Sequence, residues 1–395
     1  MPALQRAVVI VLDGVGVGQA PDAGLYGDGG ANCLTNTAEA VGALRLPTMG
    51  RLGLGNVTPI LGTPQQIPAE GAYGRLIERS AGKDSTTGHW ELMGIVLDHP
   101  MPTFPSGFPH ELVARFEAAI GRGTLGNKPA SGTAILDELG AQHLATGKPI
   151  LYTSADSVFQ LAAHEDVIPV DELYRMCQIA RGMLTGELAV GRVIARPFTG
   201  QPGSFVRTPR RRDFSLPPPA PTLLDMLREA GQDVIGVGKI EDLFAHRGLS
   251  ASTHPGTDAQ TMAATLEALE TPFRGLLFVN LVECDQVYGH RRNPVGYARH
   301  LEEIDAWLPQ VFARLGPGDA LFLTGDHGTD PTFRGTDHTR ECVPILAAGP
   351  AVQADVDLAA RTSFADLGQT LAAAFDVGPL LSGESFAAAL GLDTA

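Results

Sequence analysis

The sequence predicts an α/β protein, in which a core sheet with helices on both faces is interrupted by a smaller inserted α/β domain. Short apolar runs of strand length alternate with segments of helical periodicity, which is typical of a sheet covered on both faces. Two proline-dense stretches, at 99–109 and 216–222, bracket the middle of the chain. Such stretches are typical of domain boundaries.

The core elements are expected at both ends of the chain. The predicted core strands are 7–12, 233–237, 275–282, 320–324 and 343–347. The predicted core helices are 222–230, 258–269, a long one within 296–315 and one near 365–375. We therefore assign residues 1–99 and 217–395 to a core that resumes after the insertion.

The middle of the chain has its own helices and strands. The predicted helices there are 109–120, 133–144 and 171–184, and the predicted strands are 150–152 and 190–195. We assign residues 100–216 to an inserted cap domain whose entry and exit lie close together.

Composition excludes several classes of protein. A formal net charge of −15 argues against a general nucleic-acid binder, because phosphate backbones favour a basic surface. The longest apolar runs, such as 7–12, are far too short to span a bilayer, and the N-terminus lacks the features of a signal peptide. The four cysteines form no CxxC pair, which argues against a cysteine-based zinc site. We expect a cytoplasmic protein with no membrane or nucleic-acid partner, and no obligate protein partner is evident.

Acidic and imidazole side chains follow several predicted strands at the points where these strands end. Six such residues stand there or in the loops that follow: Asp13, Asp285, His290, Asp326, His327 and His338. The carboxyl ends of parallel strands meet in one crevice, so these side chains are expected to converge. A mixture of carboxylates and imidazoles suits Mn²⁺, Zn²⁺ or Mg²⁺. Bound cations would also reconcile the acidic chain with an anionic substrate.

Each of these residues also has a simpler interpretation when it is taken alone. An aspartate after a strand is usually a turn former or a helix N-cap. His290 precedes Arg291 and Arg292 and reads equally well as part of a solvated basic turn. All six simpler interpretations would have to hold independently, so the ordered set favours a metal centre.

A candidate nucleophile lies in the segment GKDSTTGHWELMG at 82–94. Ser85, Thr86 and Thr87 directly precede a helical pattern, and a helix N-terminus favours a phosphoryl group. A nearby metal would lower the pKa of such a hydroxyl and activate it. The simpler interpretation is a Ser/Thr N-cap, and the two roles do not exclude each other.

Three glycines after the first strand, Gly14, Gly16 and Gly18, imitate part of a dinucleotide-binding fingerprint. That motif requires a helix to receive the pyrophosphate, and here Pro21 and a polar stretch follow instead. We therefore expect no nucleotide cofactor.

Together, these residues resemble the alkaline-phosphatase superfamily, whose members use two metals and a Ser or Thr nucleophile. Within that superfamily the chain is similar to the phosphopentomutase family, and the likeness extends through nearly the whole chain. The segments that carry it are LDGVGVGQAPDA, KDSTTGHWELMG, GNKPASGTAILDELG, YTSADSVFQLAAHE, VGRVIARPF, FVRTPRRRDF and NLVECDQVYGHRRNP.

The resemblance implies specific roles for individual residues. One metal would be held by Asp13, Asp326, His327 and Ser85, and the other by Asp285, His290 and His338. The substrate would be bound by Ser154, Asp156, Val158, Arg192, Ile194, Arg207 and the core residue Lys239. The family often has Thr where this chain has Ser85, and serine is an equally competent nucleophile.

The activity implied is the interconversion of ribose 1-phosphate, and of deoxyribose 1-phosphate, with the corresponding 5-phosphate. The enzyme would be an isomerase of nucleoside and pentose phosphate metabolism that carries a phosphorylated Ser85. Its cofactors would be two Mn²⁺ ions, with Mg²⁺, Co²⁺ or Zn²⁺ as alternatives, and a sugar bisphosphate activator such as glucose 1,6-bisphosphate. The cap would recognise the sugar and exclude water.

Three alternatives make different predictions. A cofactor-independent phosphoglycerate mutase would act on phosphoglycerates, and a phosphatase or sulfatase would release inorganic product steadily. A non-catalytic metal-dependent phosphate-binding module would turn over no sugar phosphate. The sequence leaves the native metal, the preference between ribose and deoxyribose, and the oligomeric state open.

Overall fold

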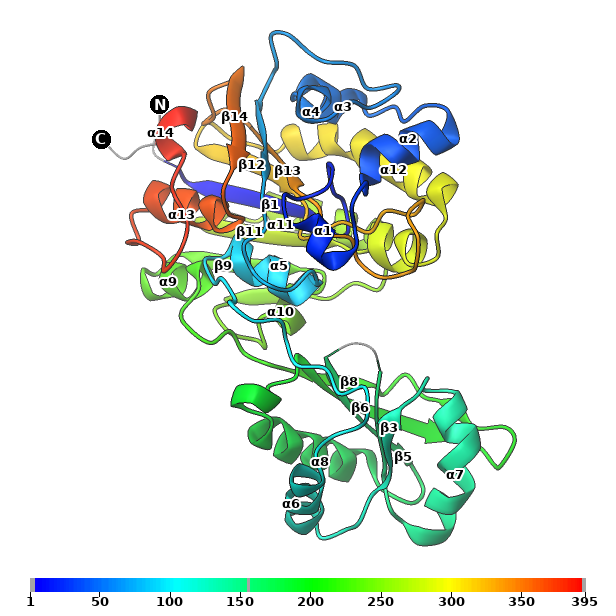
Figure 1. The fold of residues 1–395 in the computed structure, drawn as a ribbon. Coiled ribbons are helices and arrows are strands. Elements are labelled where there is room, and N and C mark those ends of the chain that lie inside the picture. Colours follow the sequence, from blue (N-terminus) through cyan, green and yellow to red (C-terminus); the bar gives the residue numbers. More distant parts are fainter. Residues whose placement is uncertain (1–3, 155–156, 393–395) are drawn as a thin grey trace. The chain divides into compact units, whose positions relative to one another are not determined.

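The computed structural model describes residues 4–154 and 157–392. The chain divides into two compact units, one formed by Met1–His99 with Pro218–Ala395 and the other by Pro100–Pro217. Each unit has its own sheet, its own helices and its own apolar interior (Figure 1). The α/β fold class predicted from the sequence is confirmed.

The first unit, the core unit, is built on an eight-stranded sheet. In spatial order its strands are β10 (Ala251–Thr253), β9 (Asp233–Val237), β11 (Gly275–Leu281), β1 (Arg6–Leu12), β12 (Asp319–Thr324), β13 (Val343–Ala348), β2 (Ala72–Leu76) and β14 (Val356–Arg361). The strands from β10 to β12 are parallel to one another. The rest of the sheet is mixed, because β13 pairs antiparallel with both β12 and β2, whereas β14 pairs parallel with β2.

The central strands are buried along their whole length. Every residue of β11 and β12 is buried, and so is every residue of β1 after Arg6. Strands covered on both faces read as continuous apolar runs, which explains why the sequence located them. Val8, Ile10 and Leu12 of β1 pack in one apolar cluster with residues from α2, α3 and α12.

The helices of the core unit form two groups, and within each group the helices contact other members of the same group (Figure 1). The first group contains α2 (Cys33–Val41), α3 (Pro47–Arg51), α4 (Leu54–Val57) and α12 (Pro294–Phe312). The second contains α5 (Ser85–Leu92), α9 (Leu223–Glu229), α10 (Ile240–Leu243), α13 (Ala365–Ala374) and α14 (Ala387–Leu390). Two further helices, α1 (Ala23–Tyr26) and α11 (Asp258–Glu270), and a π-helical turn at Cys284–Gly289 complete the unit.

The second unit, the cap unit, is a six-stranded sheet with three longer helices. Its strands are β3 (Leu125–Pro129), β4 (Ile150–Thr153), β5 (Val158–His164), β6 (Arg192–Thr199), β7 (Val206–Arg207) and β8 (Arg212–Ser215). Its helices are α6 (His110–Ile120), α7 (Ala134–Thr146) and α8 (Val170–Met183), with a short 3₁₀ turn at Gly186–Leu188. Residues of α6 and α8 share one apolar cluster with the sheet, and residues of α7 share another.

Among the described residues, no helix combines the length and the apolar character that crossing a membrane requires.

Candidate active site

The candidate site begins where three neighbouring parallel strands of the core sheet end. Asp13 directly follows β1, Asp285 lies in the π-helical turn after β11, and Asp326 and His327 follow β12. Strand β1 pairs with β11 on one side and β12 on the other, all in parallel. Their carboxyl ends therefore share one edge, as the sequence predicted.

The first group of possible metal ligands is fully buried. Donor atoms of Asp13, Asp326 and His327 all lie within 4.8 Å of one another. Nε2 of His327 is 3.5 Å from Oδ1 of Asp13 and 3.6 Å from Oδ2 of Asp326. The hydroxyl of Ser85 joins this group, 3.5 Å from Oδ1 of Asp13 and 3.2 Å from Nε2 of His327.

The second group adjoins the first. Donor atoms of Asp285, His327 and His338 also lie within 4.8 Å of one another. Nε2 of His338 is 3.5 Å from Oδ1 of Asp285, and Nε2 of His290 is 3.3 Å from Oδ2 of the same carboxylate. In this structure His327 stands in both groups, whereas the sequence analysis placed it only with Asp13 and Asp326.

Neighbouring polar groups fix the orientation of these carboxylates. The side-chain amide of Asn280 donates to Oδ2 of Asp13 at 3.0 Å, and the hydroxyl of Thr329 donates to Oδ1 of Asp285 at 2.7 Å. The main-chain N–H of Gly14 donates to Oδ1 of Asp326 at 3.1 Å. Such partners are typical of metal ligands. The sequence analysis missed Asn280 and Thr329, although an asparagine inside the apolar run of β11 was a readable signal.

The electrostatics of the site fit divalent cations. Burial, with a further contribution from the nearby carboxylates of Asp326 and Asp285, raises the pKa of Asp13 to about 6, against an opposing effect of Lys239. Oδ2 of Asp326 is buried without a hydrogen-bond partner among the described residues, although Nδ1 of His89 lies 3.1 Å away. Buried carboxylates without full compensation are costly, and a bound cation removes that cost. The donor set of oxygens and imidazoles suits such an ion.

Helix α5 presents the candidate nucleophile. Its N-cap is Asp84, whose carboxylate accepts from the main-chain N–H groups of Thr86 and Thr87. The hydroxyl of Thr87 is buried and donates to Asp84 at 2.7 Å. Asp84 therefore fills the capping role, and Ser85, the first residue of the helix, directs its hydroxyl toward Asp13 and His327.

Lys83 links this turn to the loop of His338. Its ammonium group donates to the main-chain oxygen of His338 at 2.6 Å and to the carboxylate of Asp28 at 3.0 Å. The segment before the nucleophile is thus held against the loop that supplies one of the imidazoles.

A glycine allows α5 to approach the Asp326 turn, which leads to a first prediction. A Cβ added to Gly88 would lie 2.0 Å from the main-chain oxygen of Asp326, so in Gly88→Ala the helix must move. We expect a loss of stability of about 1–3 kcal/mol, as for other overpacked sites, and slower turnover because Ser85 moves with the helix. Thermal melting and activity assays measure both. A Cβ on Gly24 in α1 would meet nothing within 4 Å, so Gly24→Ala is the control. A Gly88→Ala protein with parental melting and activity would contradict this account.

The remaining predicted residues are divided between the two units. Ser154 follows β4, Val158 and Ile194 have side chains that are 2% exposed, and Arg207 is exposed in β7. Val158 pairs with Arg192 across β5 and β6. Asp156 lies outside the described residues. Lys239 precedes α10 in the core unit and acts electrostatically on Asp13.

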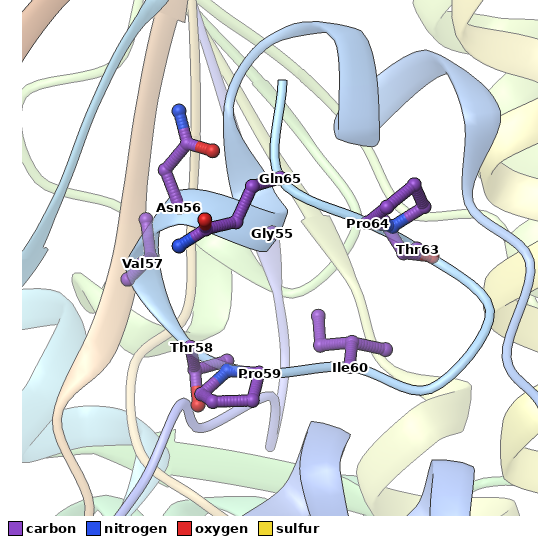
Figure 2. A pocket seen from close by; sticks show the side chains of 9 residues that line it. All are labelled: Gly55, Asn56, Val57, Thr58, Pro59, Ile60, Thr63, Pro64 and Gln65. Carbon is purple, nitrogen blue, oxygen red and sulfur yellow. The ribbon is translucent and has the colours of Figure 1, made fainter. Parts of the chain in front are cut away.

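A separate hollow of about 290 Å³ lies beside α4 (Figure 2). It is lined by residues 55–60 and 63–65 and includes Asn56, Thr58 and Gln65. None of the predicted site residues lines it.

The fold and the buried cluster of carboxylates and imidazoles define a metalloenzyme, and the family model described as the Metalloenzyme superfamily matches residues 5–379. A phosphopentomutase of Dictyoglomus turgidum is 56% identical over 97% of this chain and 97% of its own. Those of Caldanaerobacter subterraneus subsp. tengcongensis and Carboxydothermus hydrogenoformans are each 55% identical over 97% of this chain, and over 97% and 98% of their own. The chain therefore belongs to the phosphopentomutase family, which confirms the resemblance seen in the sequence.

Proposed function

We propose that the protein interconverts ribose 1-phosphate and ribose 5-phosphate, and the corresponding deoxyribose phosphates, by way of a phosphorylated Ser85. One observation carries this proposal: the Ser85 hydroxyl is in contact with both Asp13 and His327 at the edge of the sheet where the other candidate ligands gather. The full-length similarity to phosphopentomutases supports the choice of substrate.

Two divalent ions, Mn²⁺ in the first instance and otherwise Mg²⁺, Co²⁺ or Zn²⁺, would be held by the residues named from the sequence. Asp13, Asp326, His327 and Ser85 would hold one ion, and Asp285, His290 and His338 the other. Bound there, the ions would stabilise the entering and leaving oxygens of each phosphoryl transfer.

The protein's own residues would then carry the phosphoryl group. The phosphate on Ser85 would pass to the free hydroxyl of a ribose monophosphate: the bond from phosphorus to Oγ breaks as the bond to the sugar oxygen forms. The resulting ribose bisphosphate would return its other phosphoryl group to Ser85. A sugar bisphosphate such as glucose 1,6-bisphosphate would restore the phosphoserine after occasional hydrolysis.

The cap unit would recognise the pentose phosphate and keep water away from the phosphoserine. Guanidinium groups bind phosphate in bidentate fashion, which suits Arg192 and Arg207 for the distal phosphate. Ser154 and Asp156 would bind sugar hydroxyls, and Lys239 would add a positive charge from the core unit. The side chains of Val158 and Ile194 are buried, so we propose that these two residues hold the binding strands in place.

The proposal is tested by following two products at once. Purified protein with ribose 1-phosphate, Mn²⁺ and a trace of glucose 1,6-bisphosphate should form ribose 5-phosphate with little free phosphate. Steady release of phosphate without isomerisation would instead indicate a phosphatase. Turnover of phosphoglycerates in place of pentose phosphates would indicate the related mutase, and either outcome would refute the proposed function.

A further inference from the structure

One buried imidazole next to the candidate site has no role in the scheme above. His89 lies in α5, one turn after Ser85, and its side chain is fully buried. Its Nδ1 is 2.8 Å from the main-chain oxygen of Ser85 and 3.1 Å from Oδ2 of Asp326. The ring therefore stands between the residue proposed to carry the phosphate and a residue proposed to hold a metal.

The other ring nitrogen makes no comparable contact. Nε2 of His89 is buried without a hydrogen-bond partner among the described residues, and the ring packs 5.7 Å from that of Phe278, centroid to centroid. A buried unpaired polar atom is unfavourable, so an apolar ring would suit the packing alone better. What the imidazole adds at this position is the Nδ1 donor.

The two oxygens near the Nδ1 donor, the Ser85 carbonyl and Oδ2 of Asp326, indicate what the donor does. The Ser85 carbonyl belongs to the first residue of α5, so a hydrogen bond to it fixes the turn that aims the Ser85 hydroxyl. Oδ2 of Asp326 has no hydrogen-bond partner among the described residues, and the nearby Nδ1–H, 3.1 Å away, attracts this oxygen and so limits rotation of the carboxylate. Gly88, the preceding residue, allows the helix backbone to approach the turn of Asp326.

We propose that His89 is a positioning residue, whose Nδ1–H holds the Ser85 turn against the Asp326 carboxylate so that both are arranged for one metal. This inference rests on the proposed function, because it assigns Asp326 and Ser85 to the first metal. It adds a residue that touches neither the metal nor the substrate.

Two substitutions of similar size distinguish the effect of the Nδ1–H donor from the effect of side-chain packing at position 89. In His89→Asn the side-chain amide places an N–H near the position of Nδ1, and His89→Leu fills similar space without a donor. Mn²⁺ binding to metal-stripped protein is followed by calorimetry, without any sugar phosphate. We expect His89→Leu to weaken one of the two Mn²⁺ sites by about 10–100-fold and to lower kcat by a similar factor with little change in KM. His89→Asn should stay much closer to the parent in both measurements.

Parental Mn²⁺ affinity at both sites in His89→Leu, or equal weakening in the two variants, would overturn the proposal. If His89→Leu does not fold, a measurement on the parent protein tests the proposal instead. Its ¹⁵N-labelled Nδ1 resonance, identified by its loss in His89→Asn, should shift when diamagnetic Zn²⁺ is added, and an unchanged resonance would overturn the proposal. Neither the metal titration nor the resonance depends on pentose phosphate turnover, so failure of the proposed function would be recognised separately.

Discussion

Ser85→Ala is expected to abolish isomerisation, with kcat lowered about 10³-fold or more, because removal of a nucleophile leaves no acceptor for the phosphoryl group. The hydroxyl of Ser85 lies 3.2 Å from Nε2 of His327 and 3.5 Å from Oδ1 of Asp13. Asp84 caps α5 through the main-chain N–H groups of Thr86 and Thr87, so the helix should persist without the serine hydroxyl. The loss would therefore be chemical and leave thermal melting nearly unchanged.

The neighbouring residues supply matched controls for this variant. Thr86→Ala removes the adjacent hydroxyl and should retain isomerase activity, while Ser85→Thr keeps a hydroxyl at the position proposed to be phosphorylated and should retain substantial turnover. Mass spectrometry after incubation with glucose 1,6-bisphosphate should locate the phosphate on residue 85 in the parent and in Ser85→Thr. Phosphate found on Thr86 or Thr87, or isomerisation by Ser85→Ala, would contradict the assignment.

The sequence predicted best the elements whose pattern is local. The strand expected at 233–237 has those bounds in the structure, and the strand expected at 320–324 begins one residue earlier, at Asp319. Both are mostly apolar runs that are followed by a glycine, Gly238 and Gly325. The alignment of Asp13, Asp285 and Asp326 followed from the same pattern, because parallel strands bring their carboxyl ends to one edge.

Strands stabilised by distant partners were missed. β2 (Ala72–Leu76) has the sequence AYGRL, with a glycine and an arginine, and pairs with β13, whose residues lie more than two hundred positions further along the chain. Among the described strands β14 pairs with β2 alone, and its register shifts between Asp357 and Ala359. In the cap unit, β5 is buried throughout yet includes Gln160 and His164, which hide the apolar pattern. Such strands owe their conformation to pairing and burial more than to intrinsic preference.

The contacts between side chains in the site could not be predicted from the sequence, because they depend on three-dimensional geometry. The place of His327 in both groups of possible ligands depends on distances of a few ångströms. The contact of His89 with Asp326 depends on how closely α5 packs against the Asp326 turn, which a single glycine, Gly88, permits. Residue types and their order indicate which chemistry is available, and packing decides which atoms meet.

Removal of the metals is expected to abolish isomerisation and to lower the melting temperature by an amount that depends on pH. In the metal-free protein, burial and two neighbouring carboxylates raise the pKa of Asp13 from 3.8 to about 6. A raised carboxyl pKa favours the fold at low pH, and that contribution is lost as pH rises through about 6. Above this pH the ionised Asp13 costs the metal-free protein up to about 3 kcal/mol, and a bound cation offsets that cost.

Proton competition reinforces the effect. A metal ligand must be deprotonated, so protons compete with Mn²⁺ for Asp13 and for the imidazoles of the site, and Mn²⁺ affinity should fall as the pH is lowered from 8 to 5. The gain in melting temperature on adding Mn²⁺ to chelator-treated protein should therefore be clearly larger at pH 8 than at pH 5. Differential scanning calorimetry at the two pH values measures this difference directly.

Asp13→Asn tests the assignment to this carboxylate. The variant removes the buried charge, so its metal-free form should melt above the metal-free parent at pH 8. Its gain from Mn²⁺ should be clearly smaller than that of the parent, because only the site of Asp285, His290 and His338 remains intact, and isomerisation should be lost. Asp98→Asn, at an exposed position, should behave like the parent in every one of these measurements. A parental gain from Mn²⁺ that is equal at both pH values, or a gain that is undiminished in Asp13→Asn, would show that another group governs metal binding.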